Sequence, residues 1–129
     1  VITPSTTRPS SPQAFALLSG SLWQPSTGEV IDSSCLSEAK VIAFYFSASW
    51  GPADKHFTPI MVEAYTLIRS RHGELAFEIV MVPMDKERAA WDAYIENLPW
   101  LCVPFDDRET VERLVQEYDV NTIPRLVIV

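Results

Sequence analysis

Cysteine and histidine are scarce in this sequence, whose 129 residues include two of each. Cys35 and Cys102 are too few and too far apart to form a disulfide framework, so a reducing, intracellular setting is the simpler interpretation. Together with His56 and His72 they show no spacing typical of metal ligands, so we expect neither a metal site nor a cofactor. Glycine-rich phosphate loops are also missing, which argues against nucleotide binding.

Basic residues and long apolar runs are scarce as well. The sequence carries 10 Lys and Arg against 17 Asp and Glu, a formal net charge of −7. An acidic surface repels phosphate backbones, so we expect no nucleic-acid partner. The longest apolar stretches, such as 41–46, are too short to cross a bilayer, and no apolar leader opens the chain. These absences predict a cytoplasmic protein without a membrane partner.

The length of the chain suits one domain with a sizeable hydrophobic core. Residues 1–12 are rich in Pro, Ser and Thr and carry one charge, that of Arg8. Because such a segment cannot bury enough apolar surface to offset its ordering entropy, we expect a flexible tail there. Residues 13–129 are then expected to form the folded domain.

Apolar patterning in the folded part predicts strands that alternate with helices. Two short apolar runs around a Pro-Ser-Thr-Gly turn predict a hairpin over 21–32. Continuous apolar runs typical of strands covered on both faces occupy 41–46, 77–82 and 126–129. Helical spacing predicts helices from Phe57 to Gly73, over 91–98, and from a capping box at 106–109 to Tyr118. This order indicates a layered α/β domain with right-handed crossovers.

Four stretches of the sequence carry a family resemblance. Residues 44–50, Phe-Tyr-Phe-Ser-Ala-Ser-Trp, lie where the first central strand gives way to a helix, and they resemble the tryparedoxin and nucleoredoxin branch of the thioredoxin superfamily. The stretches 56–59, 98–107 and 118–127 are similar to the same family in order and with the expected spacing. The resemblance implies a thioredoxin-like α/β fold, with a twisted central sheet flanked by helices.

The redox motif of that family is altered in this chain. The family has a Cys-x-x-Cys motif after the tryptophan, whereas Trp50 is followed here by Gly51, Pro52, Ala53 and Asp54. Disulfide exchange needs a thiolate at the first position and a resolving thiol three residues later. Gly51 has no side chain, and the carboxylate of Asp54 cannot attack or leave as a thiolate does. The altered motif therefore predicts the loss of dithiol–disulfide catalysis, with no catalytic residue in the motif.

The replacements suit the start of a helix. Gly51 is acceptable at an N-cap, Pro52 is pre-organised at the first helical position, and Asp54 faces the positive end of the helix. Such terms are worth about 0.3–1 kcal/mol each at exposed positions. We therefore expect Asp54 to have a structural role as a helix-start residue.

The resemblance also implies a peptide-binding groove. Ile123–Pro124 matches the family's cis-proline, which lies against the redox motif and offers backbone groups to an extended peptide. Arg125 departs from the threonine that is common in the family, and we expect it to place a cation beside the groove. The residues expected to contact a protein or peptide partner are Trp50, Gly51, Pro52, Asp54, Ile123, Pro124 and Arg125.

Three functions stay open at this point. The first is a redox-inactive binding or regulatory module, a pseudoenzyme that uses the cis-proline groove. The alternative is a thiol–disulfide oxidoreductase of the cell redox system that uses Cys35, Cys102 or a thiol from a partner chain. The third is a purely structural domain of a larger protein.

The end of the sequence gives one further expectation. The family continues after its cis-proline strand with an antiparallel strand and a helix, and neither follows Val129 in this sequence. A sheet without that edge strand would expose unpaired backbone groups, which predicts self-association through an uncovered sheet edge.

Overall fold

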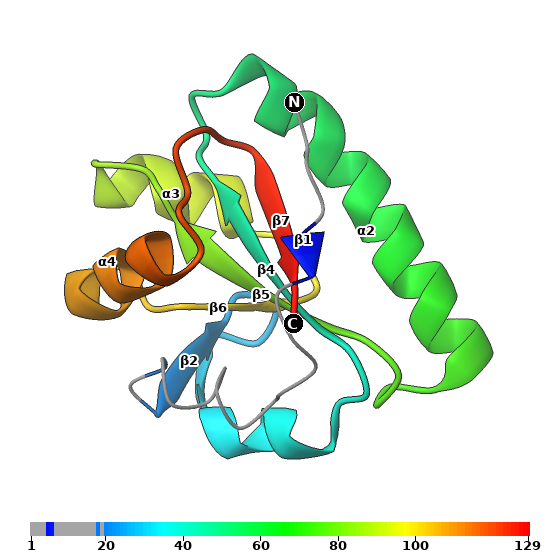
Figure 1. Cartoon of the computed structure of the whole chain (residues 1–129). Helices are drawn as coiled ribbons and strands as arrows, with labels where there is room; N and C mark the ends of the chain where they lie inside the picture. The colour runs from blue at the N-terminus through cyan, green and yellow to red at the C-terminus, as the bar shows by residue number, and fades with distance from the viewer. Residues whose placement is uncertain (1–4, 7–17, 19) are drawn as a thin grey trace.

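The computed structural model of the chain describes residues 5–6, 18 and 20–129 (Figure 1). Its described residues form one mixed sheet with the strand order β1-β7-β4-β5-β6-β2-β3. The strands are β1 (Ser5–Thr6), β2 (Ser21–Gln24), β3 (Glu29–Asp32), β4 (Ile42–Ser47), β5 (Glu78–Pro83), β6 (Leu101–Cys102) and β7 (Arg125–Ile128). The helices are the 3₁₀ helix η1 (Ser33–Glu38), α2 (Pro52–His72), α3 (Arg88–Ile95) and α4 (Arg108–Glu117). This is the α/β fold that the sequence predicts.

The central strands β4 and β5 are buried on both faces, as their continuous apolar runs predict. They pair in parallel from Ile42 opposite Glu78 to Ser47 opposite Pro83. Successive side chains of a strand point to opposite faces, and β4 accordingly supplies two separate cores. Phe44 and Phe46 belong to the core that includes side chains of η1 and α4, and Tyr45 to the core that includes side chains of α2 and α3.

Helix α2 ends before Gly73, as predicted, but it begins at Pro52, the start that the altered motif suggests, and not at Phe57, where the apolar spacing begins. Pro52 occupies its first turn, and Gly73 caps its C-terminus with φ at 95°, a left-handed conformation that glycine adopts at little cost. The helix is 21 residues long and continues through Pro59. Among the described residues, none of the helices combines the length and apolar character that a bilayer span requires.

The structure differs from the sequence prediction at two short features. Strand β6 has only two residues, too few to show a period, yet it connects β5 to the hairpin because Trp23 pairs with Cys102. The N-cap of α4 is Asp107, not Asp106, and its carboxylate accepts a hydrogen bond from the backbone N–H of Thr110 at 3.2 Å. Asp106 instead forms an ion pair with Arg88, which sequence spacing cannot reveal.

The outer side of β7 is occupied by β1. Ser5 pairs with Val127 and Thr6 with Ile128 in parallel register, so two residues of the expected flexible tail form a strand. The rest of 1–12 lies outside the described residues. The expectation of an uncovered edge is therefore wrong at these two positions, because strand pairing uses backbone groups that a Ser-Thr segment supplies as well as an apolar one.

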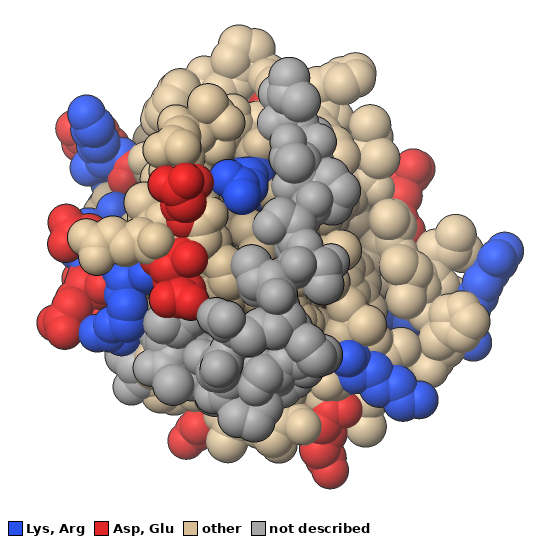
Figure 2. Space-filling model, in the orientation of Figure 1, with Lys and Arg blue, Asp and Glu red and all other residues tan. Residues whose placement is uncertain are grey.

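Charged side chains of both signs are spread over the surface. On the side that carries α4, acidic and basic side chains are interspersed (Figure 2). The described basic side chains visible on this face do not gather into one patch.

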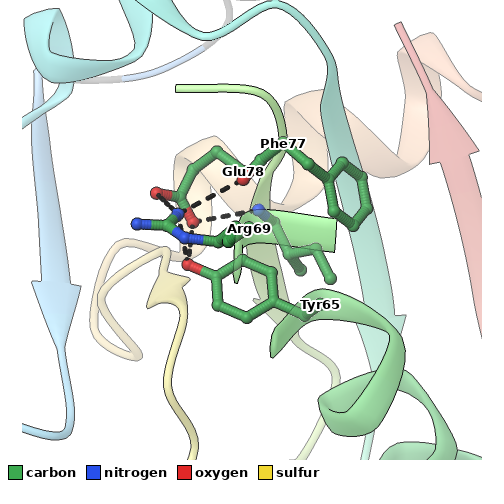
Figure 3. A network of polar contacts seen from close by, with 5 residues as sticks. Tyr65, Arg69, Phe77 and Glu78 are labelled. Carbon is green, nitrogen blue, oxygen red and sulfur yellow. Dashed lines mark hydrogen bonds and ion pairs between the residues drawn. The ribbon is translucent and has the colours of Figure 1, made fainter. Parts of the chain in front are cut away.

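A polar clamp fastens the second half of α2 to the start of β5 (Figure 3). Arg69 donates to the carboxylate of Glu78 at 2.9 Å, to the hydroxyl of Tyr65 at 2.6 Å and to the carbonyl of Phe77 at 3.2 Å. Tyr65 donates in turn to Glu78 at 2.8 Å. Burial, followed by the charge of Glu78, raises the pKa of Tyr65, so its hydroxyl keeps the proton that it donates.

Arg69→Met should destabilise the fold by about 1–3 kcal/mol, because it leaves the poorly exposed Glu78 carboxylate without its cation. Urea denaturation followed by circular dichroism measures the change. Arg71→Met is the matched control, since Arg71 is exposed on the same helix and should cost less than about 0.5 kcal/mol. Equal losses in the two variants would show that the clamp contributes nothing specific.

Candidate functional site

The candidate site lies at the end of the sheet where β4 and β5 finish and β7 begins. These strand ends meet there because β4 and β5 are parallel and β7 is antiparallel to β4. The loops that leave them lie at the upper end of the sheet in Figure 1. They enclose a surface groove, called here the cis-proline groove, that is lined by Trp50, Met84, Val120, Asn121, Thr122 and Ile123.

Two of the residues expected in a binding groove, Trp50 and Ile123, line this groove together. Trp50 is 65% exposed, which is unusual for so large an apolar side chain. The Ile123–Pro124 peptide bond is cis, and Pro124 itself is buried. Pro52 is exposed at the start of α2 but does not line the groove.

Four groove residues were missed by the sequence analysis. Met84 directly follows β5. Because β4 and β5 are parallel, their ends lie at the same edge of the sheet, and this arrangement could have predicted that Met84 lies beside Trp50. Val120, Asn121 and Thr122 immediately precede Ile123, and only the path of their loop brings them to the groove. No pattern in a loop sequence predicts such a path.

Arg125 contacts the loop that leads to the cis-proline bond. Its Nη1 atom donates to the carbonyl oxygen of Asp119 at 3.2 Å, and its Nε atom is buried without a hydrogen-bond partner among the described residues. Arg125 is not among the residues that line the groove. Its guanidinium therefore braces the loop from Asp119 to Pro124, and a cation beside the groove stays a prediction.

The side chain of Asp54 is buried, whereas the sequence predicts an exposed carboxylate at the start of a helix. It is 1% exposed, and its Oδ2 atom accepts hydrogen bonds from Ser47 Oγ at 2.7 Å and from the backbone N–H of Ala48 at 2.9 Å. The carboxylate thus reaches back to the end of β4. Two donors there offset the desolvation of a buried carboxylate, which explains why the side chain turns inward.

Gly51 and Asp54 depend on each other sterically. A Cβ atom added at Gly51 would lie 2.3 Å from Asp54 Oδ1 and 2.8 Å from Asp54 Cγ, far inside contact distance. The φ of Gly51 is −79°, which any residue adopts, so the need for glycine is purely steric. The two departures from the Cys-x-x-Cys pattern therefore form one unit, in which the carboxylate occupies the space beside position 51.

A chain of hydroxyl groups extends from Asp54 into the protein. Ser47 Oγ lies 2.8 Å from the hydroxyl of Tyr94, which lies 2.7 Å from Thr58 Oγ1, which lies 2.8 Å from the hydroxyl of Tyr45. Burial raises the pKa of both tyrosines, so these groups stay neutral. Asp54 is thereby connected to neutral hydrogen-bond donors and acceptors and not to a nucleophile.

A second buried carboxylate holds the same loop. Asp85 is 1% exposed and accepts a hydrogen bond from the backbone N–H of Ser49 at 3.0 Å. Asp54 holds the preceding N–H, that of Ala48. The two carboxylates come from different elements and hold consecutive peptide groups just before Trp50. The loop that presents Trp50 to the groove is therefore fixed from two sides.

Neither cysteine of the chain has the character of an activated thiol. Cys35 lies in η1 and is exposed, but partial burial of its sulfur and the charges of Glu78 and Asp32 raise its pKa. Cys102 lies in β6, and complete burial raises its pKa further. Both are unpaired in the structure. A raised pKa reduces the thiolate fraction at neutral pH, and the thiolate is the reactive form.

The sequence of the chain matches a known protein family. Residues 38–129 match a family model described as thioredoxin-like, and the chain belongs to that family. It is 37% identical over 101 residues to tryparedoxin of Trypanosoma brucei brucei, covering 78% of this chain and 67% of that protein. It is 43% identical over 90 residues to probable nucleoredoxin 1 of Arabidopsis thaliana, covering 70% of this chain.

Solved structures of tryparedoxins are similar to the fold of this chain. Tryparedoxin II from C. fasciculata superposes with a TM-score of 0.80 at 30% identity, covering 89% of this chain and 77% of that one. Within the thioredoxin-like family, the chain therefore lies in the tryparedoxin and nucleoredoxin branch. It spans only 15% of the Arabidopsis nucleoredoxin and 22% of the nucleoredoxin of Mus musculus.

The steric dependence of Gly51 on Asp54 can be measured with a double-mutant cycle. Gly51→Ala should destabilise the protein by about 1–3 kcal/mol, because its methyl group and the Asp54 carboxylate cannot occupy the same space. In the Asp54→Ala background the same change should cost at least about 1 kcal/mol less. Urea denaturation of the four proteins gives the coupling energy, and purely additive losses would contradict the interlock.

The raised thiol pKa values predict slow alkylation. In native protein, iodoacetamide should modify Cys35 more slowly than free cysteine, with a rate that still rises above about pH 8.5 because the thiolate forms only at higher pH. Cys102 should react only after denaturation. Mass spectrometry of the modified protein across pH measures both rates. Fast modification of Cys35 that levels off below about pH 8.5 would contradict this assignment.

Proposed function

We propose that this domain is a redox-inactive binding module, a pseudoenzyme of the tryparedoxin and nucleoredoxin branch that holds an extended segment of a protein partner in the cis-proline groove. The observation that carries the proposal is the interlock of Gly51 with the buried carboxylate of Asp54. Gly51 and Asp54 occupy the positions of both redox thiols, and the neighbouring groove stays open.

The loss of redox chemistry is supported by the absence of a suitable thiol at the site. The alternative function requires Cys35, Cys102 or a thiol from a partner chain as the nucleophile, and the pKa of each of the two cysteines of this chain is raised. Neither lines the cis-proline groove. Without an activated thiol in the groove, a bound disulfide substrate would have no attacking group from this chain.

A binding role is supported by the way Trp50 is displayed. An exposed tryptophan is a typical anchor in protein interfaces, and here its loop is held by the carboxylates of Asp54 and Asp85. A fixed loop lowers the entropy lost on binding. Met84 and Ile123 add apolar surface, and Asn121 supplies an amide that can bond to a peptide backbone.

The proposed setting is the reducing cytoplasm. Two unpaired cysteines support it, since proteins of oxidising compartments typically pair theirs. The acidic net charge supports a protein partner over a nucleic acid.

The first test is reduction of insulin disulfides in the presence of dithiothreitol. The protein should give no acceleration over dithiothreitol alone, because the motif has no thiol. The Cys35→Ser/Cys102→Ser variant is the matched control and should behave identically. Turnover by the native protein that disappears in this variant would overturn the proposal in favour of the oxidoreductase alternative.

The second test concerns the groove. Peptides selected from a random phage-displayed library on the immobilised protein should quench or shift the fluorescence of exposed Trp50. Trp50→Ala should weaken their binding at least about tenfold, as expected for an interface anchor. Binding should persist in Val30→Lys, a substitution at an exposed position of β3, away from this groove. Selected peptides that bind Trp50→Ala as well as the native protein would contradict a function for this groove.

A further inference from the structure

A second groove lies beside the β2–β3 hairpin, and it shares no lining residue with the cis-proline groove. It is called here the hairpin groove. Its apolar wall is formed by Trp23 and Val30 of the hairpin, Trp91 and Ile95 of α3, and Phe105 of the loop before α4. We propose that the hairpin groove binds an extended, basic segment of a protein partner, in which apolar residues alternate with Lys or Arg.

The apolar wall is accessible at its outer side. Val30 is 67% exposed, although it is a β-branched residue in a strand, and Trp23 and Phe105 are only partly buried. Trp91 and Ile95 are buried and fix the floor, because they are part of the core between α3 and the sheet. The groove therefore combines a rigid base with an apolar rim that a partner could cover.

The edge of β3 explains why an extended segment fits. Ser33 N–H donates to the carbonyl of Gly20 at 2.9 Å, which continues the β2–β3 ladder. Inward and outward backbone groups alternate in an antiparallel pair, so those of Val30 and Asp32 face away from β2. Within the described part of the chain β3 pairs only with β2. A strand added along β3 would bond to these groups and direct alternate side chains to the groove face.

The charges of the groove select a basic partner. Three acidic side chains, those of Asp92, Glu96 and Asp106, line it together with one basic side chain, that of Arg88. Arg88 is already shared, since its guanidinium lies 3.5 Å from Asp92 and also pairs with Asp106. The groove is thus left with excess negative charge.

Further acidic residues surround the groove. Glu29 and Asp32 on β3 are exposed and extend the negative surface along the strand edge. A second copy of this chain, with a net charge of −7, would be repelled from such a surface. A cationic segment is attracted to it, and its apolar residues would cover Val30.

The proposal is tested with a synthetic capped peptide of alternating Lys and Val, titrated into ¹⁵N-labelled protein. The largest chemical-shift changes are expected at Val30, at the Trp23 indole and at Phe105. Val30→Lys and Glu96→Lys, both at exposed positions, should each weaken binding at least about tenfold while leaving the fold intact by circular dichroism. Trp50→Ala should leave the affinity unchanged, which separates this groove from the cis-proline groove.

Two controls make the result decisive. A matched peptide with Glu in place of Lys should not bind, and raising the salt concentration should weaken the Lys peptide. Equal affinity for both peptides, shift changes centred on Trp50, or affinity unaffected by Val30→Lys and Glu96→Lys would each overturn the proposal. Sedimentation showing a dimer that Val30→Lys dissociates would also overturn it, in favour of a second copy as the occupant.

Discussion

The hydrogen bonds of the buried Asp54 carboxylate determine the rest of the candidate site. A carboxylate that is 1% exposed is stable there only because Ser47 Oγ and the N–H of Ala48 donate to it. Its position excludes any Cβ atom at residue 51 and fixes the end of β4. The loop that follows is held through the N–H groups of Ala48 and Ser49, and Trp50 is displayed from it. The shape of the groove therefore depends on a carboxylate that is not among its lining residues.

Both grooves are built on one framework but use it differently. The cis-proline groove lies at the end of β4 and β5, where irregular loops meet, and two carboxylates hold the loop of Trp50. The hairpin groove lies at the edge of the sheet that is formed by β2 and β3, and α3 forms its base. The paired strands β5 and β6 lie between the two grooves, without an intervening loop or hinge. Occupation of one groove is therefore expected to leave the shape of the other unchanged.

Long regular features of the fold could be predicted from the sequence, whereas short ones could not. The continuous run in β4 and the glycine cap of α2 carry local signals, and both elements are where those signals place them. Strand β6 has two residues and no period. The family resemblance placed Trp50 near Ile123, but the inward turn of Asp54 depends on donors at the end of β4, which only tertiary structure brings close. Arg125 likewise finds its partner, the Asp119 carbonyl, through the path of a loop.

The interlock of Gly51 and Asp54 has a consequence for how such a domain can evolve. A single change that restores a thiol at position 51 would meet the carboxylate at less than contact distance. A single change that restores a thiol at position 54 would leave Ser47 and Ala48 without their acceptor. Each reversal alone passes through a less stable protein, so the two positions are epistatic. A chain with thiols at both positions is therefore reached with least strain when the two residues change together.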